Sequence, residues 1–129
     1  MPIFDAIGII SSDLAESIRF YRLLGVPFPE DPDSDHVEAS LPGGMRLMLD
    51  SEALVAQHFA DWSPPTGGLP RTALAFLCES PSEVDAVHDT IVAAGFPSHT
   101  APFDAPWGQR YATVGDPDAN HVDLFAPLE

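Results

Sequence analysis

A strand followed by a capped helix occurs twice in this sequence, and this duplication restricts the possible folds more than any other feature. In the first half, residues 3–10 are apolar and rich in β-branched side chains, which predicts a buried strand. Asp13 with Glu16 three residues later has the form of a capping box, and Gly25 is suited to end the helix that follows. The first 25 residues therefore predict one strand and one helix.

The second copy begins after the middle of the chain. Residues 72–77 predict another strand. Ser80, Pro81 and Glu83 supply a helix N-cap, a proline at the first helical position and a capping glutamate, and Gly95 is suited to end this helix. Gly95 follows the glycine that ends the first helix by 70 positions, which indicates an internal repeat.

We predict that each helix is followed by three strands, which gives one α+β domain of two βαβββ modules. The modules cover about residues 1–62 and 71–129, and the loop of residues 63–70, rich in proline and glycine, joins them. The curved sheet of such a module needs a cover on its concave face, from the other module or from a second chain. This arrangement predicts a cup-shaped mixed sheet that can enclose a ligand.

Composition narrows the partners of the domain. The chain has 129 residues, of which 20 are acidic and 5 basic, for a net charge of −15, so nucleic acid is an unfavourable partner on electrostatic grounds. A cationic ligand would be attracted, although solubility alone is an equally good reason for surface acidity. No apolar stretch is long enough to span a membrane and the N-terminus does not resemble a signal peptide, so we expect a cytoplasmic location.

The C-terminal part of the sequence predicts a β-hairpin. Two stretches of alternating apolar and polar residues within 107–124 flank a turn at Pro117, Asp118 and Asn120. The second stretch contains Asp123. An acidic residue at this position of the hairpin is a candidate ligand-binding group.

These segments resemble the vicinal oxygen chelate superfamily, which includes glyoxalase I, extradiol dioxygenases, fosfomycin-modifying enzymes and the non-enzymatic bleomycin resistance proteins. The resemblance covers essentially the whole chain and is based on Asp13-Leu14, Phe20-Tyr21, Leu24-Gly25, Asp116-Pro117-Asp118-Ala119-Asn120 and Asp123. Residues 65–68, 107–112 and 122–128 are similar to mitomycin-binding resistance proteins in particular. The resemblance implies the vicinal oxygen chelate fold.

Metal-dependent members of that superfamily place ligands on the first and last strands of each half. The corresponding positions are Ala6, a residue at or near Leu47, Thr72 or Ala73, and Asp123. Only the last carries a carboxylate, whereas a catalytic divalent ion needs about three protein ligands. The resemblance therefore implies a chain with no metal and no other cofactor.

A relocated metal site is the alternative, with His36, Glu38, Asp50 and His121 as its candidate ligands. His36 and Glu38 lie two residues apart on one strand face, but no group of these residues has the spacing of a known metal site. We interpret the other histidines, His58, His88 and His99, as surface or turn residues.

The resemblance to the resistance proteins implies that Trp107 stacks on a planar drug and that His36 forms the opposite side of this aromatic sandwich. Strand alternation places Gln109, Tyr111 and Thr113 on one face, and we expect them to line the cup with the last-strand acid. Other acidic residues are candidates to pair with a ligand ammonium. The complete set of predicted ligand-binding residues is Trp107, His36, Tyr111, Gln109, Thr113, Asp50, Asp104, Phe103, Asp123 and Leu47.

The leading hypothesis is a homodimeric, non-catalytic protein that sequesters a planar cationic or quinone-type antibiotic and so protects the cell that produces it. The sequence contains no Ser-His-Asp or Cys-His motif and no phosphate-binding glycine loop. A glyoxalase-like or dioxygenase-like enzyme with an unusual or absent metal site is the first alternative. A drug carrier or sensor is the second.

Overall fold

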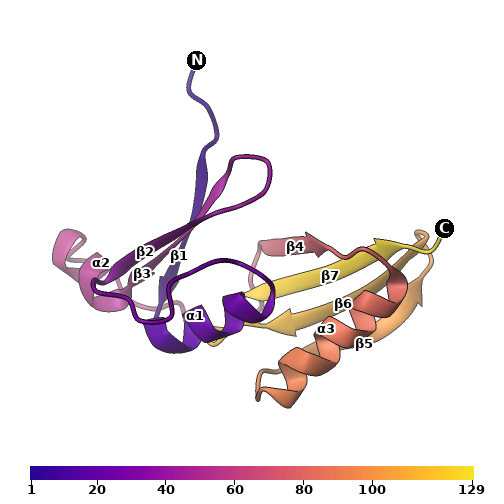
Figure 1. The fold of residues 1–129 in the computed structure, drawn as a ribbon. Coiled ribbons are helices and arrows are strands. Elements are labelled where there is room, and N and C mark those ends of the chain that lie inside the picture. The colour runs from indigo at the N-terminus through magenta and orange to yellow at the C-terminus, as the bar shows by residue number, and fades with distance from the viewer. The chain divides into compact units, whose positions relative to one another are not determined.

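The computed structural model describes all residues, 1–129, as an α+β protein with two compact units (Figure 1). Unit 1 comprises Met1–Gly67 and unit 2 comprises Gly68–Glu129, so the division falls inside the loop of residues 63–70. Each unit has its own β-sheet, with two helices in unit 1 and one helix in unit 2. None of the helices has both the length and the apolar character needed to cross a membrane.

Unit 1 contains a three-stranded mixed sheet in the order β1-β3-β2. The first strand runs parallel to the third and the second runs antiparallel to it. The elements of this unit are β1 (Ala6–Ser11), α1 (Leu14–Leu23), β2 (His36–Ser40), β3 (Arg46–Ser51) and α2 (Glu52–His58).

Two details of unit 1 differ from the sequence prediction. Only two strands, β2 and β3, follow α1, and helix α2 takes the place of a third strand, while residues 26–35, with three prolines, form no strand. The first strand also begins later than expected, so that Ile3 and Phe4 lie outside it with 87% and 72% of their surface exposed. The strand is therefore Ala6–Ser11, and it is only partly buried, with Ser11 as its buried residue and Ile10 36% exposed.

The core of unit 1 forms between α1 and one face of its sheet. The Asp13 side chain accepts a hydrogen bond from the backbone N–H of Glu16 at 3.2 Å, which begins the helix as the capping pattern predicts. The helix buries Ile18, Phe20 and Tyr21, and the sheet contributes alternate residues that include Leu47, Leu49, Val37 and Ala39. Burial of this apolar surface holds the helix on the sheet.

Unit 2 contains a four-stranded mixed sheet in the order β4-β7-β6-β5. Its first and last strands in the sequence run parallel, and the other neighbouring pairs run antiparallel. The elements of this unit are β4 (Ala73–Leu77), α3 (Pro81–Ala93), β5 (Ser98–Ala105), β6 (Gln109–Gly115) and β7 (His121–Pro127).

Helix α3 covers one face of this second sheet. Val122 and Leu124 of β7 are fully buried, as are Val84 and Ile91 of the helix. Arg110 of β6 faces the same way, because its guanidinium donates to both carboxylate oxygens of Asp85 on α3, at 2.9 and 3.0 Å. Since neighbouring residues of a strand point to opposite faces, these contacts also identify the residues that point away from α3.

The turn between β6 and β7 is held by Asp116. Its carboxylate accepts hydrogen bonds from the backbone N–H groups of Asp118 and Asn120, both at 2.9 Å, and from the Asn120 amide at 2.8 Å. The residue with positive φ is Ala119, at 65°, and not either of its polar neighbours as the turn chemistry suggests. The Asp-Pro-Asp-Ala-Asn segment is therefore a structural turn.

One histidine was assigned wrongly from the sequence. His88 is not on the surface but 7% exposed between α3 and β5, where its Nε2 atom lies 2.7 Å from the Ser98 hydroxyl. A hydrogen-bond partner of this kind offsets the cost of burying a polar side chain on the inner face of an amphipathic helix.

Candidate ligand-binding face

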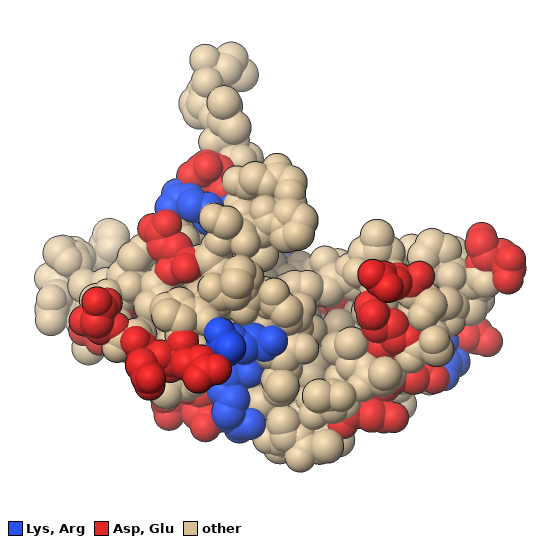
Figure 2. All heavy atoms as spheres, in the orientation of Figure 1, with Lys and Arg blue, Asp and Glu red and all other residues tan.

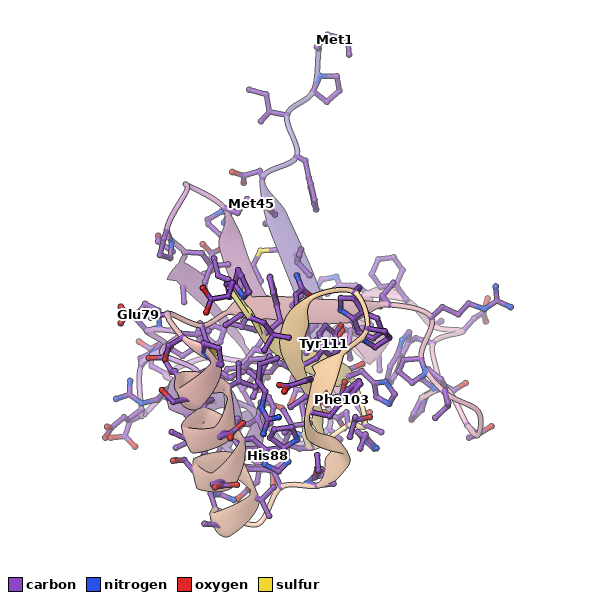
Figure 3. The ribbon with its side chains drawn as sticks, turned by 90° about the vertical axis from the view of Figure 1, so that its right-hand side faces the viewer. Met1, Met45, Glu79, His88, Phe103 and Tyr111 are labelled. Carbon is purple, nitrogen blue, oxygen red and sulfur yellow. The ribbon has the colours of Figure 1, made fainter.

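The predicted binding residues of unit 2 gather on the sheet face that points away from α3, which we call the aromatic face. It carries alternate residues of the two central strands and two aromatic side chains from β5 and the turn that follows it. Figure 3 labels Tyr111 and Phe103 on the neighbouring strands β6 and β5, and His88 on α3. The residues that define the aromatic face are Phe103, Trp107, Gln109, Tyr111, Thr113, His121, Asp123 and Phe125.

Trp107 is held in one orientation although 58% of its surface is exposed. Its indole N–H donates a hydrogen bond to the Gln109 side chain at 2.9 Å. The Tyr111 ring lies edge-on at 5.3 Å with an interplanar angle of 82°, and the Phe103 ring at 6.0 Å with an angle of 89°. Edge-to-face contacts of this kind are favourable. The indole is therefore a preorganised aromatic surface with room for a ligand.

The carboxylate of Asp123 is fixed by two neutral hydroxyl groups. The Thr113 hydroxyl donates to one carboxylate oxygen at 2.8 Å, and the Tyr111 hydroxyl donates to the other. Burial, followed by the nearby carboxylate, raises the pKa of Tyr111 to about 12. The phenol is therefore protonated at neutral pH and acts as a hydrogen-bond donor.

Beside this carboxylate, β4 presents two alanines, and the next residue on that face is Leu77, which pairs with Phe125. Ala75 of β4 pairs with Asp123 and Ala73 pairs with His121, and both alanines are exposed. The sheet is therefore open beside the carboxylate, where a larger side chain would cover it.

Two histidines at the end of this face were not among the predicted binding residues. The rings of His99 and His121 lie 4.5 Å apart, and His99 occupies the space that a side chain at Gly115 would fill. His121 lies two residues before Asp123 on the same strand, and residues two positions apart point to the same face of a sheet. This spacing is a sequence signal that places His121 on the aromatic face. No comparable signal exists for His99, because β5 has two register irregularities.

Asp104 does not lie on the aromatic face. It pairs with Arg110 in the strand register, and its carboxylate accepts a hydrogen bond from that guanidinium at 3.2 Å. The guanidinium belongs to the α3 side of the sheet, where it also binds Asp85. The carboxylate near Trp107 in sequence is therefore neutralised on the opposite side of the sheet.

His36 and Asp50, the predicted binding residues of unit 1, form a charged cluster with Glu38. The two ring nitrogens of His36 contact different carboxylates, Nδ1 that of Asp50 and Nε2 that of Glu38, the second at 2.9 Å. Arg46 donates to Glu38 at 2.6 Å and also to Asp5. The Glu38 and Asp50 carboxylates raise the pKa of His36. Both ring nitrogens are thus engaged, and Asp50 already has a basic partner.

Leu47 belongs to the hydrophobic core of unit 1, with 1% of its surface exposed on the side of α1. The strand register explains the difference from its predicted role. Gly8 pairs with Met48 two residues into β1, as Ala75 pairs with Asp123 two residues into β4. Met48 is therefore the counterpart of Asp123, and a shift of one residue moves a side chain to the other face.

The residues at the family's metal-ligand positions do not fit a divalent ion. Ala6 and Ala73 have no donor atom, the first-half counterpart of Asp123 is a methionine, and Asp123 itself is engaged by two hydroxyl groups. His36, Glu38 and Asp50 are neighbours, but the imidazole lies between the two carboxylates and their donor atoms do not share a common centre. No three His, Cys, Asp or Glu side chains are arranged to hold a metal.

Comparisons with known proteins agree on the fold. The family model described as Glyoxalase/Bleomycin resistance protein/Dioxygenase superfamily matches residues 3–124. No curated protein matches the chain. Among solved structures, a glyoxalase/bleomycin resistance protein/dioxygenase from Nocardioides is 26% identical with a TM-score of 0.72, and the match covers 100% of this chain and 85% of that one.

Two further structures are similar at lower identity. A glyoxalase/bleomycin resistance protein/dioxygenase family enzyme from Burkholderia phytofirmans PsJN is 21% identical with a TM-score of 0.80, over 97% of this chain and 98% of that one. A lactoylglutathione lyase from Agrobacterium tumefaciens is 20% identical with a TM-score of 0.68, over 96% and 92%. At this identity the similarity establishes the fold and not the activity.

Proposed function

Because the chain belongs to the glyoxalase/bleomycin resistance protein/dioxygenase superfamily, we propose that it is a non-catalytic binding protein that sequesters a planar antibiotic. The observation that carries the proposal is Trp107, which is exposed yet held by one hydrogen bond and two edge-on rings. A ligand that stacks on such an indole does not need to immobilise it, so little conformational entropy is lost on binding.

The charge of the protein supports a cationic ligand. With a net charge of −15, the protein attracts cations over long range, and the face of an indole attracts a cation at short range. Figure 2 shows acidic side chains spread over the visible surface of both units and few basic ones. The basic residues Arg46 and Arg110 are themselves paired with carboxylates.

Sequestration also agrees with the chemistry of the aromatic face. The raised pKa of Tyr111, about 12, keeps the phenol as a hydrogen-bond donor to Asp123, so it is not the phenolate that a nucleophile needs at neutral pH. We propose a homodimer that gives resistance in proportion to its abundance.

The test is a binding measurement with planar antibiotics that include mitomycin C, with and without EDTA. We expect Trp107→Ala to weaken binding by more than about tenfold, because it removes the stacking surface. Phe59→Ala, which deletes an aromatic side chain that is 66% exposed in unit 1, is the matched control and should bind as the wild type does. Equal binding by the Trp107→Ala variant would refute the proposal.

Recovery of the ligand separates binding from catalysis. A sequestering protein returns the drug chemically unchanged and binds a fixed number of molecules per chain. Turnover of the drug, or binding that EDTA abolishes, would instead indicate an enzyme of this superfamily. The contribution of His36 stays a prediction, and His36→Ala measured in the same assay tests it.

A further inference from the structure

Asp123 differs in its partners from Asp104 and Asp50, the other carboxylates predicted to bind the ligand. The charge of Asp104 is neutralised by Arg110, and the charge of Asp50 is neutralised by His36 when the imidazole is protonated. Asp123 accepts hydrogen bonds only from Tyr111 and Thr113, which carry no charge, and it forms no ion pair. The half-buried aromatic face therefore contains a carboxylate whose negative charge has no cationic partner in this chain.

The two hydroxyl groups position this carboxylate without saturating it. Each carboxylate oxygen can accept about two hydrogen bonds, and each accepts one here, so an acceptor site is left on both. On the β4 side, Ala75 is opposite Asp123 and leaves space above it. A ligand nitrogen can reach the remaining acceptor sites from this open side.

Tyr111 connects this carboxylate to the stacking surface. Its hydroxyl group donates to Asp123, and its ring contacts the indole of Trp107 at 5.3 Å. The carboxylate and the indole are thus separated by about the length of one phenol ring. A rigid ligand of two or three fused rings is long enough to contact both.

We propose that Asp123 is the counter-ion for a cationic nitrogen of the ligand, and that the ligand class is a planar fused aromatic ring system with a protonated amine or amidine at its edge. This inference rests on the proposed function and makes it more specific. A charge-assisted hydrogen bond to a half-buried carboxylate is stronger than one between neutral groups. A planar anion of the same size would be excluded, because it would place two negative charges together.

The probes for the test are proflavine, a planar tricyclic cation, and acridone, a neutral tricycle of similar size, both measured at physiological salt by fluorescence titration. Wild-type protein should prefer proflavine by about tenfold or more. Asp123→Asn should weaken proflavine binding by about tenfold and change acridone binding by less than about threefold, because the amide keeps the shape but loses the charge.

The matched control is Asp89→Asn, which removes the same charge from an exposed carboxylate on α3, on the opposite side of the sheet. It should leave the affinity for both probes unchanged, which separates a local ion pair from the overall negative field. Equal wild-type affinity for both probes would overturn the inference without any variant. Equal loss of affinity in the Asp89→Asn and Asp123→Asn variants would overturn it as well.

Failure of this inference and failure of the proposed function give different results. If Asp123 is not the counter-ion, Trp107→Ala still weakens binding of both probes while Asp123→Asn has no selective effect. If the aromatic face does not bind planar ligands at all, neither probe binds and Trp107→Ala changes nothing. Far-ultraviolet circular dichroism of each variant confirms that the fold is retained.

Discussion

Gly115 has to remain without a side chain because His99 occupies the space beside it. A Cβ atom built on Gly115 would lie 2.6 Å from His99 Nε2, 3.2 Å from His99 Cδ2 and 3.0 Å from Pro97 Cγ. A contact below 3.0 Å cannot persist, so the His99 ring must shift, which disturbs its contact with His121 at 4.5 Å. Overpacking costs roughly 1–3 kcal/mol, and because the end of an exposed side chain can move away, we expect Gly115→Ala to be destabilised by about 1 kcal/mol.

Gly8 provides a matched control. It is also a strand glycine, but a Cβ atom there would meet only Met48 Cε at 3.6 Å, an ordinary contact. Neither glycine has a positive φ, so alanine strains the backbone at neither position. Gly8→Ala should therefore be neutral or stabilising by about 0.5 kcal/mol, because alanine reduces the conformational freedom of the unfolded chain.

Urea unfolding at neutral pH measures both variants, and the double variant Gly115→Ala, His99→Ala tests the mechanism. If the collision with the imidazole is the cause, removal of His99 should recover most of the lost stability, as a positive coupling in a double-mutant cycle. A Gly115→Ala protein as stable as the wild type would refute the packing argument. So would a double variant that is destabilised by the sum of the two single effects.

Two predictions concern ionisation. Tyr111 should ionise near pH 12 in a spectrophotometric titration. Because its pKa is raised in the folded state, the stability that it contributes is complete below about pH 10 and is lost as the pH rises through 12. A phenolate signal near pH 10 that the Tyr111→Phe variant lacks would contradict this prediction. His36 should titrate above pH 6.5 by NMR, and Asp50→Asn should lower the pKa of His36. Because this pKa is raised in the folded state, the stabilisation by His36 is present below pH 6.5 and decreases as the pH rises through the folded pKa. An unchanged His36 pKa in the Asp50→Asn variant would contradict the ion pair.

The repeated strand and helix could be predicted because their signals are local. The caps at Asp13 and Ser80 accept the expected backbone N–H groups, and both helices begin where the sequence indicates. The first module differs from the predicted one in having two strands after its helix, because the segment after β3 forms helix α2 and not a third strand. The sequence does not predict the exposure of Ile3 and Phe4, because an apolar stretch does not indicate the residue at which pairing between strands begins.

The candidate site was predicted in part. Alternation along β6 and β7 correctly places Gln109, Tyr111 and Thr113 on one face with Asp123. Asp104 was assigned to this site from its closeness to Trp107 in the sequence, but the strand register turns it toward Arg110. Leu47 is one residue away from Met48, the counterpart of Asp123 in the first half. Because neighbouring residues of a strand point to opposite faces, Leu47 lies on the other face of its sheet.

The sequence by itself determined the periodicity, the caps and the residue types available for chemistry, because these depend on neighbours along the chain. Only the tertiary structure decided which carboxylates are neutralised, since Arg110 and Asp85 are 25 residues apart and His36 and Asp50 are 14 apart. It also decided that Asp123 is held by neutral hydroxyl groups and that Trp107 is fixed by rings from two strands. Strand pairing brings such groups together, and pairing across long loops leaves little trace in local sequence.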